Sequence, residues 1–103
     1  MQFLIIAHDG TDEGAMDRRI AARQSHLEFC AQSLKDGNQY VGAAMLDDTG
    51  KMKGSVMIVD YPDRAAVDAW LAKEPYVVGK VWKNIEVIPC KIPDTFAHCI
   101  PKK

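Results

Sequence analysis

The order in which strand and helix patterns follow one another constrains the fold of this chain more than any other feature of its sequence. Residues 2–7 (QFLIIA) form a short apolar run rich in strand formers, which predicts a strand covered on both faces. From about Gly14 to Lys35 the apolar period becomes helical, and Gly37 follows as the expected left-handed residue that ends the helix. The buried stripe of this helix is predicted to hold Met16, Ile20, Leu27, Cys30, Ala31 and Leu34.

The second half of the chain has strand patterns on both sides of one helix. Residues 39–46 and 52–61 are joined by the turn residues 47–50 and so predict a hairpin, with Gly54 marking a bulge or a close approach. A second helix begins at Pro62 and ends near Lys73 or Glu74, because the residue before Pro75 avoids helical backbone. In the last strand one face is predicted to carry Val81, Ile85 and Val87, and the other Trp82, Asn84 and Glu86.

The resulting order, β-α-β-β-α-β, predicts an α+β fold of the ferredoxin-like type. In that fold two helices lie on one face of a four-stranded antiparallel sheet. A chain of 103 residues fits one domain, and we expect it to span residues 1–91, with residues 92–103 as a C-terminal tail.

Several classes of function are disfavoured by composition and by missing motifs. The net charge of −1 and a third strand without aromatic residues (KMKGSVMIVD) argue against nucleic-acid binding. No apolar run approaches the roughly 18 residues that cross a membrane, and the apolar start lacks a basic leader. The chain has no phosphate-binding or dinucleotide-binding glycine motif, so no cofactor is expected.

The chain has three cysteines, which is an odd number, and they are not closely spaced, so the sequence does not predict a disulfide framework. Reduced thiols in a cytoplasmic protein are the simplest interpretation. Cys90, His98 and Cys99 match no zinc-binding spacing, and no metal is expected.

His26 is the main candidate for chemistry. It shares one flank of the first helix with Arg19, Arg23 and Cys30, where it could reach both the sheet and solvent. Imidazole exchanges protons near neutral pH, so His26 could act as a general acid or base. The competing interpretation is a helix-surface histidine with a structural hydrogen bond, which spacing alone favours.

Glu74 is the second candidate, because Pro75 fixes it at the end of the second helix. Its carboxylate could orient an imidazole and stabilise the protonated ring. The competing interpretation is a solvated acid at a helix end, although the helix dipole disfavours an acid there. His8 and Asp9 end the first strand. They could line the entrance to a site formed by His26 and Glu74, or they could be ordinary loop residues.

These residues resemble the YCII-related family over nearly the whole chain, from Met1 to about Lys91. Arg23-Gln24-Ser25-His26-Leu27 is similar to the Arg-x-x-His-Leu segment of that family. Gly37, Gly42 and Gly54-Ser55 fit its pattern, and Ala69-Trp70 and Glu74-Pro75-Tyr76 resemble its Ala-Trp and Asp-Pro-Tyr elements.

The resemblance implies a homodimer and a site built on a histidine and an aspartate, which map by position to His26 and Glu74. Glu74 replaces the aspartate and adds a methylene to the acid. A misplacement of about 1 Å can cost on the order of a hundredfold in rate, so the length of this acid bears on any catalysis by the pair. The residues expected to bind substrate are Arg19, Arg23, His8 and Tyr76.

Two functions follow from these expectations. The first is a lyase or isomerase that moves a proton on a small organic molecule, as in the dehydrochlorinases and lactone isomerases related to this family. His26 would be the base and Glu74 would hold its tautomer. The second is a non-catalytic, dimeric binding or accessory protein. The sheet face without helices would form the dimer contact, with Tyr40, Met57, Trp82, Phe96 and Ile100 as candidate residues.

Overall fold

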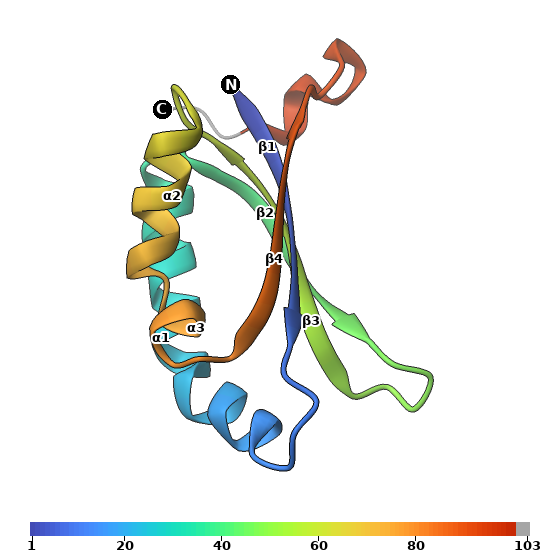
Figure 1. The fold of residues 1–103 in the computed structure, drawn as a ribbon. Helices are drawn as coiled ribbons and strands as arrows, with labels where there is room; N and C mark the ends of the chain where they lie inside the picture. The colour runs from blue at the N-terminus through green and yellow to red at the C-terminus, as the bar shows by residue number, and fades with distance from the viewer. Residues whose placement is uncertain (101–103) are drawn as a thin grey trace.

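A twisted four-stranded antiparallel sheet organises the protein, and its strands lie in the order β2-β3-β1-β4. The computed structural model describes residues 1–100. The strands are β1 (Gln2–Asp9), β2 (Gln39–Leu46), β3 (Met52–Asp60) and β4 (Trp82–Cys90). The helices α1 (Ala15–Lys35), α2 (Arg64–Lys73) and α3 (Pro75–Val78) cover one face, and the short η1 (Asp94–Cys99) follows β4 (Figure 1).

This arrangement is a ferredoxin-like α+β fold, as the sequence predicts. The segment Tyr76 to Gly79, which the sequence indicates only as a turn, contributes instead to the extra helix α3. Within residues 1–100 no helix is long and apolar enough to cross a membrane.

The core lies between the sheet and the helices. Alternate residues of β1 and β3, such as Ile5 and Val59, point into it and meet Val67, Trp70, Leu71, Tyr76 and Val81 from the helical layer and the turn after it. Met57 and Trp82 also lie in this core, so their predicted place on the opposite face is wrong.

Two physical causes explain these errors. β3 carries apolar residues on both faces, so the alternation of polar and apolar residues cannot show which face of the sheet Met57 lies on. In β4 the register shifts between His8 and Asp9 of its partner, and this bulge turns Trp82 to the same side as Ile85.

Helix α1 turns a stripe of mixed character toward the sheet, in which polar residues stand among Ala15, Ala22 and Phe29. Arg19 and Ser33 are buried and His26 is nearly so, at intervals of seven residues, whereas Ile20, Leu27 and Leu34 are exposed. The prediction that these three apolar residues are buried is therefore wrong, and Ala31, which was predicted in the same stripe, is exposed as well. Each polar residue of the stripe has a partner: Asp9 and Ser55 for Arg19, Glu74 for His26, and Trp70 Nε1, which donates to Ser33 Oγ. Paired polar groups can be buried at little cost, so pairing outweighs the hydrophobic pattern here.

Two predicted glycine roles are confirmed. Gly37 has a φ of 80° at the end of α1. At Gly54 a β-carbon would overlap the carbonyl oxygen of Ala7 on the neighbouring strand, so the sheet needs glycine there.

Candidate active site

Glu74 stands at the junction of α2 and α3 because of the proline that follows it. Pro75 places Glu74 in extended backbone with a ψ of 124°, which ends α2, and Pro75 then begins α3. The Glu74 carboxylate accepts the backbone N–H of Tyr76 at 2.9 Å and so caps α3. The capping role explains why an acid stands where the dipole of α2 alone would disfavour it.

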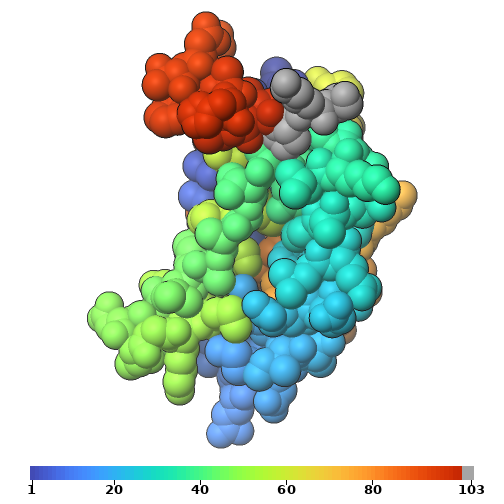
Figure 2. Space-filling view, turned by 180° about the vertical axis from the view of Figure 1, so that it is seen from behind, coloured from blue at the N-terminus to red at the C-terminus, as the bar shows by residue number. Residues whose placement is uncertain are grey.

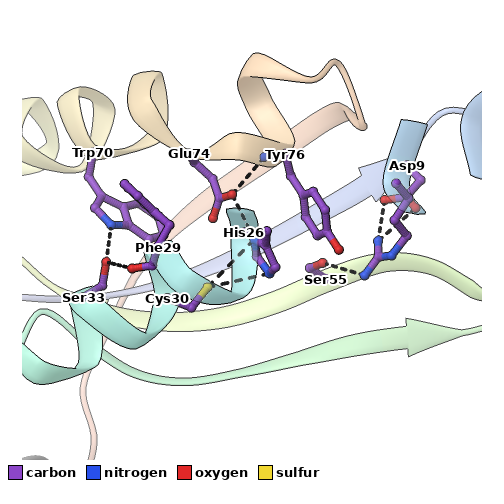
Figure 3. A network of polar contacts seen from close by, with 10 residues as sticks. Asp9, His26, Phe29, Cys30, Ser33, Ser55, Trp70, Glu74 and Tyr76 are labelled. Carbon is purple, nitrogen blue, oxygen red and sulfur yellow. Dashed lines mark hydrogen bonds and ion pairs between the residues drawn. The ribbon is translucent and has the colours of Figure 1, made fainter. Parts of the chain in front are cut away.

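The same carboxylate oxygen reaches His26 from across the interface with α1. Nδ1 of His26 lies 2.9 Å from Oε1 of Glu74, and this side chain is 0% exposed while the imidazole is 12% exposed. The Tyr76 ring stacks on the imidazole, with centroids 3.8 Å apart and planes 10° apart. Trp82 lies edge-on to both rings. Figure 3 shows the bond between His26 and Glu74, with Tyr76 beside them. The longer acid therefore does reach His26, and packing fixes the plane of the ring.

This geometry assigns the protons of the imidazole. An ionised carboxylate only accepts hydrogen bonds, so the shared proton belongs to Nδ1 of His26. In the neutral ring Nε2 then keeps its lone pair and can accept a proton. Glu74 would stabilise the imidazolium that results, as the acid of a catalytic triad does.

Cys30 lies one turn along α1 from His26. Its Sγ atom is 3.8 Å from Nδ1 and 3.6 Å from Nε2, so the sulfur stands over the ring and not along the lone pair of either nitrogen. Burial, together with the Glu74 charge, raises the pKa of the Cys30 thiol to about 11. Cys30 is therefore a neutral thiol near pH 7 and packs against the imidazole.

His26, Cys30 and Glu74 together also form a possible metal-ligand set. One donor atom from each lies within 4.8 Å of the others. A metal on imidazole lies along a nitrogen lone pair, yet Nδ1 of His26 is bonded to Glu74 and the sulfur lies over the ring. The donor atoms do not converge on one point, so this geometry favours a hydrogen-bonded pair over a metal centre.

The guanidinium of Arg19 is already bound by other side chains of this protein. Its Nη1 donates to both carboxylate oxygens of Asp9 at 2.9 Å, and its Nη2 donates to Ser55 Oγ at 3.3 Å. The guanidinium lies 4.9 Å from the centroid of the Tyr76 ring. Because its charge is neutralised and buried, Arg19 fixes the wall beside His26 and is not a free anion-binding group.

A cavity of about 290 Å³ opens between α1 and the β2–β3 hairpin. Figure 2 shows this side of the molecule, with α1 in blue to cyan and the hairpin in green. Arg23, which forms no ion pair within residues 1–100, lies one turn before His26 in the cavity wall. The lining residues are Arg19, Arg23, His26, Leu27, Cys30, Gln39, Gly42, Ala43, Ala44, Met52, Ser55, Met57 and Tyr76.

Most of the predicted site residues come together here, and one does not. Arg19, Arg23, His26 and Tyr76 line the cavity, and Glu74 lies buried behind His26. His8 points to the opposite face of the sheet, where its Nε2 is 3.7 Å from Glu86.

Sequence reasoning missed several groups at this site. The pairing of Asp9 with Arg19 was not predicted, nor were the contributions of Gln39 and Ser55 to the cavity wall. Asp9 ends a covered strand and Ser55 stands among apolar residues of β3, and a polar residue in such a place is the signal that could have indicated a paired role.

The comparisons with known proteins agree with this fold. A model of the YCII-related domain matches residues 1–91. The chain belongs to the YCII-related family. Within this family, the protein YciI of Escherichia coli O6:H1 and that of Shigella flexneri are each 29% identical over 98 residues, covering 88% of this chain and 97% of the relative. An uncharacterized protein of Haemophilus influenzae has the same identity and coverage.

Solved structures show the same fold. A 5-chloro-2-hydroxyhydroquinone dehydrochlorinase from Burkholderia phenoliruptrix AC1100, in complex with 2,5-dihydroxybenzoquinone, superimposes with a TM-score of 0.77. The two chains are 22% identical, over 92% of this YCII-related chain and 98% of the other. An antibiotic biosynthesis monooxygenase superimposes with a TM-score of 0.52 at 17% identity, over 90% of this chain and 100% of the other. At these identities the likeness shows the fold alone.

Proposed function

We propose that this protein is a lyase or isomerase that moves a proton on a small organic molecule, with His26 as general base. The observation that carries the proposal is the hydrogen bond between His26 Nδ1 and the fully buried Glu74, beside a cavity that His26 lines. A base oriented by a buried carboxylate is a recurring arrangement in proton-transfer enzymes.

In the proposed reaction Nε2 of His26 takes a proton from carbon or oxygen of the substrate. The electron pair left behind expels a leaving group in a lyase, or returns to another atom of the substrate in an isomerase. In a dehydrochlorination, for example, the substrate loses the proton to His26 and the chloride to solvent, and no oxidant is needed. Arg23 would bind the oxygen that carries negative charge as the proton leaves.

Chlorinated hydroquinones are the first substrate class to test. The dehydrochlorinase of Burkholderia phenoliruptrix shares the fold over most of both chains and is named for such a substrate. The cavity of about 290 Å³ is at the small end of ligand cavities, which suits a substrate of this size.

The experiment is a turnover screen with chlorinated hydroquinones and small lactones, followed by chloride release and product absorbance. We expect His26→Gln to lower turnover by roughly a hundredfold or more. His8→Gln is the matched control, because His8 lies on the other face of the sheet. Equal turnover by wild type and His26→Gln on every accepted substrate would refute the proposal. Tight binding without turnover by the wild type would instead favour the second candidate, a non-catalytic binding protein.

We further propose that two copies of the chain associate through the sheet face that carries no helix. This face holds apolar side chains, of which Leu4 and Ile58 are partly buried and Val41 and Ile88 are exposed. A second, apolar cavity of about 500 Å³ is bordered by the first three of these residues together with Tyr40 and with Phe96 of η1. An uncovered apolar face of this kind is typical of an interaction surface.

The larger cavity is not the proposed catalytic site. It has no histidine and no carboxylate among its lining residues within residues 1–100, so it lacks a group suited to accept a proton near neutral pH. We assign it to the apolar surface that a second copy would cover.

A further inference from the structure

We infer that the cavity beside His26 accepts only single-ring monoanions, and that Gly42 and Ala44 of β2 set this limit together with Arg23. The inference deepens the proposed function, because it names the substrate class of the same site. It rests on three observations: the small residues on the strand side of the cavity, the charges around it, and an unpaired acceptor in its wall.

The strand side of the cavity is formed by residues with little or no side chain. Gly42 pairs with Met57 and Ala44 pairs with Ser55, so both small residues face the helices as these buried partners do. A β-carbon at Gly42 would lie 3.1 Å from Nε2 of Gln39 and 3.5 Å from Cγ of Met57. Space for a ligand therefore exists because these two positions are small, and a branched side chain at either would enter it.

The charges around the cavity leave room for one anion. Arg19 is neutralised by Asp9, and the imidazole of His26 is bonded to Glu74. Arg23 is the one lining cation without an ion-pair partner within residues 1–100, and none of the lining residues there is acidic. One carboxylate or phenolate would balance Arg23, whereas a second negative charge would find no partner.

The wall of the cavity also offers a hydrogen-bond acceptor. Gln39 is 3% exposed, and its Oε1 has no hydrogen-bond partner within residues 1–100. After a rotation of the Gln39 side chain toward the cavity, a hydroxyl group on the ligand could donate to this oxygen and supply the missing hydrogen bond. Arg23 and His26 are three residues apart on α1, so their β-carbons are about 5–6 Å apart and one aromatic ring can contact both.

Three probe ligands test this inference by direct binding, measured by titration calorimetry. Para-hydroxybenzoate is a single-ring monoanion, para-hydroxybenzamide is its neutral counterpart, and a hydroxynaphthoate is a monoanion with a second fused ring. We expect the wild type to bind para-hydroxybenzoate about tenfold or more tightly than either of the others. Equal affinity for the one-ring and two-ring acids would overturn the size limit.

Variants test separately the residues proposed to set the size limit and the residue proposed to set the charge preference. Ala44→Leu should weaken para-hydroxybenzoate binding by about tenfold or more, whereas Ala21→Leu, at an exposed position of α1 outside the cavity, should not. Arg23→Gln should abolish the preference for the acid over the amide, with Arg64→Gln on α2 as control. Gly42→Ala serves as a milder second variant if Ala44→Leu lowers the thermal midpoint of the protein.

The outcomes separate this inference from the proposed function. Selective binding without turnover of any substrate would leave the inference standing and remove the enzyme proposal. Turnover by the wild type, together with unchanged ligand binding in Ala44→Leu and Arg23→Gln, would support the enzyme proposal and refute this inference.

Discussion

Oε1 of Glu74 lies 2.9 Å from Nδ1 of His26 and also 2.9 Å from the backbone nitrogen of Tyr76. One buried oxygen thus caps α3 and orients the imidazole, so the pair of helices and the candidate base depend on the same atom. The tautomer of His26 follows from this contact, because the ionised carboxylate accepts a hydrogen bond and the proton stays on Nδ1.

The first prediction concerns Glu74→Gln, which keeps the shape of the side chain and removes its charge. We expect turnover to fall by roughly a hundredfold or more, because the imidazolium loses the charge that stabilises it. Nitrogen NMR of His26 should show an altered balance between the two ring tautomers. Glu86→Gln, on the other face of the sheet, is the control and should leave both measurements unchanged.

The second prediction contrasts two arginine–aspartate pairs. The side chains of Arg19 and Asp9 are 3% and 6% exposed, whereas those of Arg64 and Asp68 are both 57% exposed. Arg19→Met leaves Asp9 charged and buried, so we expect it to lower the free energy of unfolding by about 3–5 kcal/mol.

Arg64→Met should cost about 1 kcal/mol or less, because water screens an exposed pair. Urea unfolding measures both values. Similar losses for the two variants would contradict the structural role assigned to Arg19.

The third prediction is a pH dependence of stability that depends on Cys30. Burial raises the pKa of its thiol in the folded protein from the ordinary 9.0 to about 11. The unfolded chain therefore loses this proton at lower pH than the folded protein does. Stability should be fully present below about pH 9 and fall as the pH rises toward about 11.

Cys30→Ser should lack this part of the decline when unfolding is measured across the same pH range. The raised pKa values of Tyr61 and Tyr76 affect the wild type and this variant equally, so the difference isolates the thiol. Cys99→Ser, at an exposed position, should behave as the wild type. Identical pH profiles for the wild type and Cys30→Ser would show that burial does not shift this thiol.

The fourth prediction tests self-association. Ile58→Glu places a charge in the middle of the apolar sheet face, so we expect sedimentation to show a shift from dimer to monomer at micromolar concentration. Val78→Glu, at an exposed position of α3, should leave the dimer intact. A wild-type protein that sediments as a monomer would reject the dimer itself.

The order of elements could be predicted from the sequence because proline, glycine and turn residues mark the boundaries by local chemistry. Burial was harder to predict where long-range partners decide it. Leu27 is exposed, whereas Arg19 is buried. Asp9 and Ser55 accept hydrogen bonds from the Arg19 guanidinium, and these bonds offset the free-energy cost of burying its charge. The bulge that turns Trp82 inward depends on pairing with β1, which no local pattern in β4 shows.

The candidate site was predictable in part for the same reason. His26 and Glu74 could be identified from a helix flank and a proline-fixed acid, together with the family resemblance. The contact between them depends on how α1 packs against the junction of α2 and α3, which spacing along the chain does not encode. The roles of Gln39 and Ser55 arise only once the hairpin closes one side of the cavity.

The shared oxygen of Glu74 gives the protein an internal reporter. Exchange of the Tyr76 amide hydrogen with heavy water requires the bond to Glu74 to open, and any movement of this oxygen away from His26 would open that bond as well. The protection of this single amide therefore sets an upper limit on how often the base loses its orienting partner, and the measurement needs no substrate.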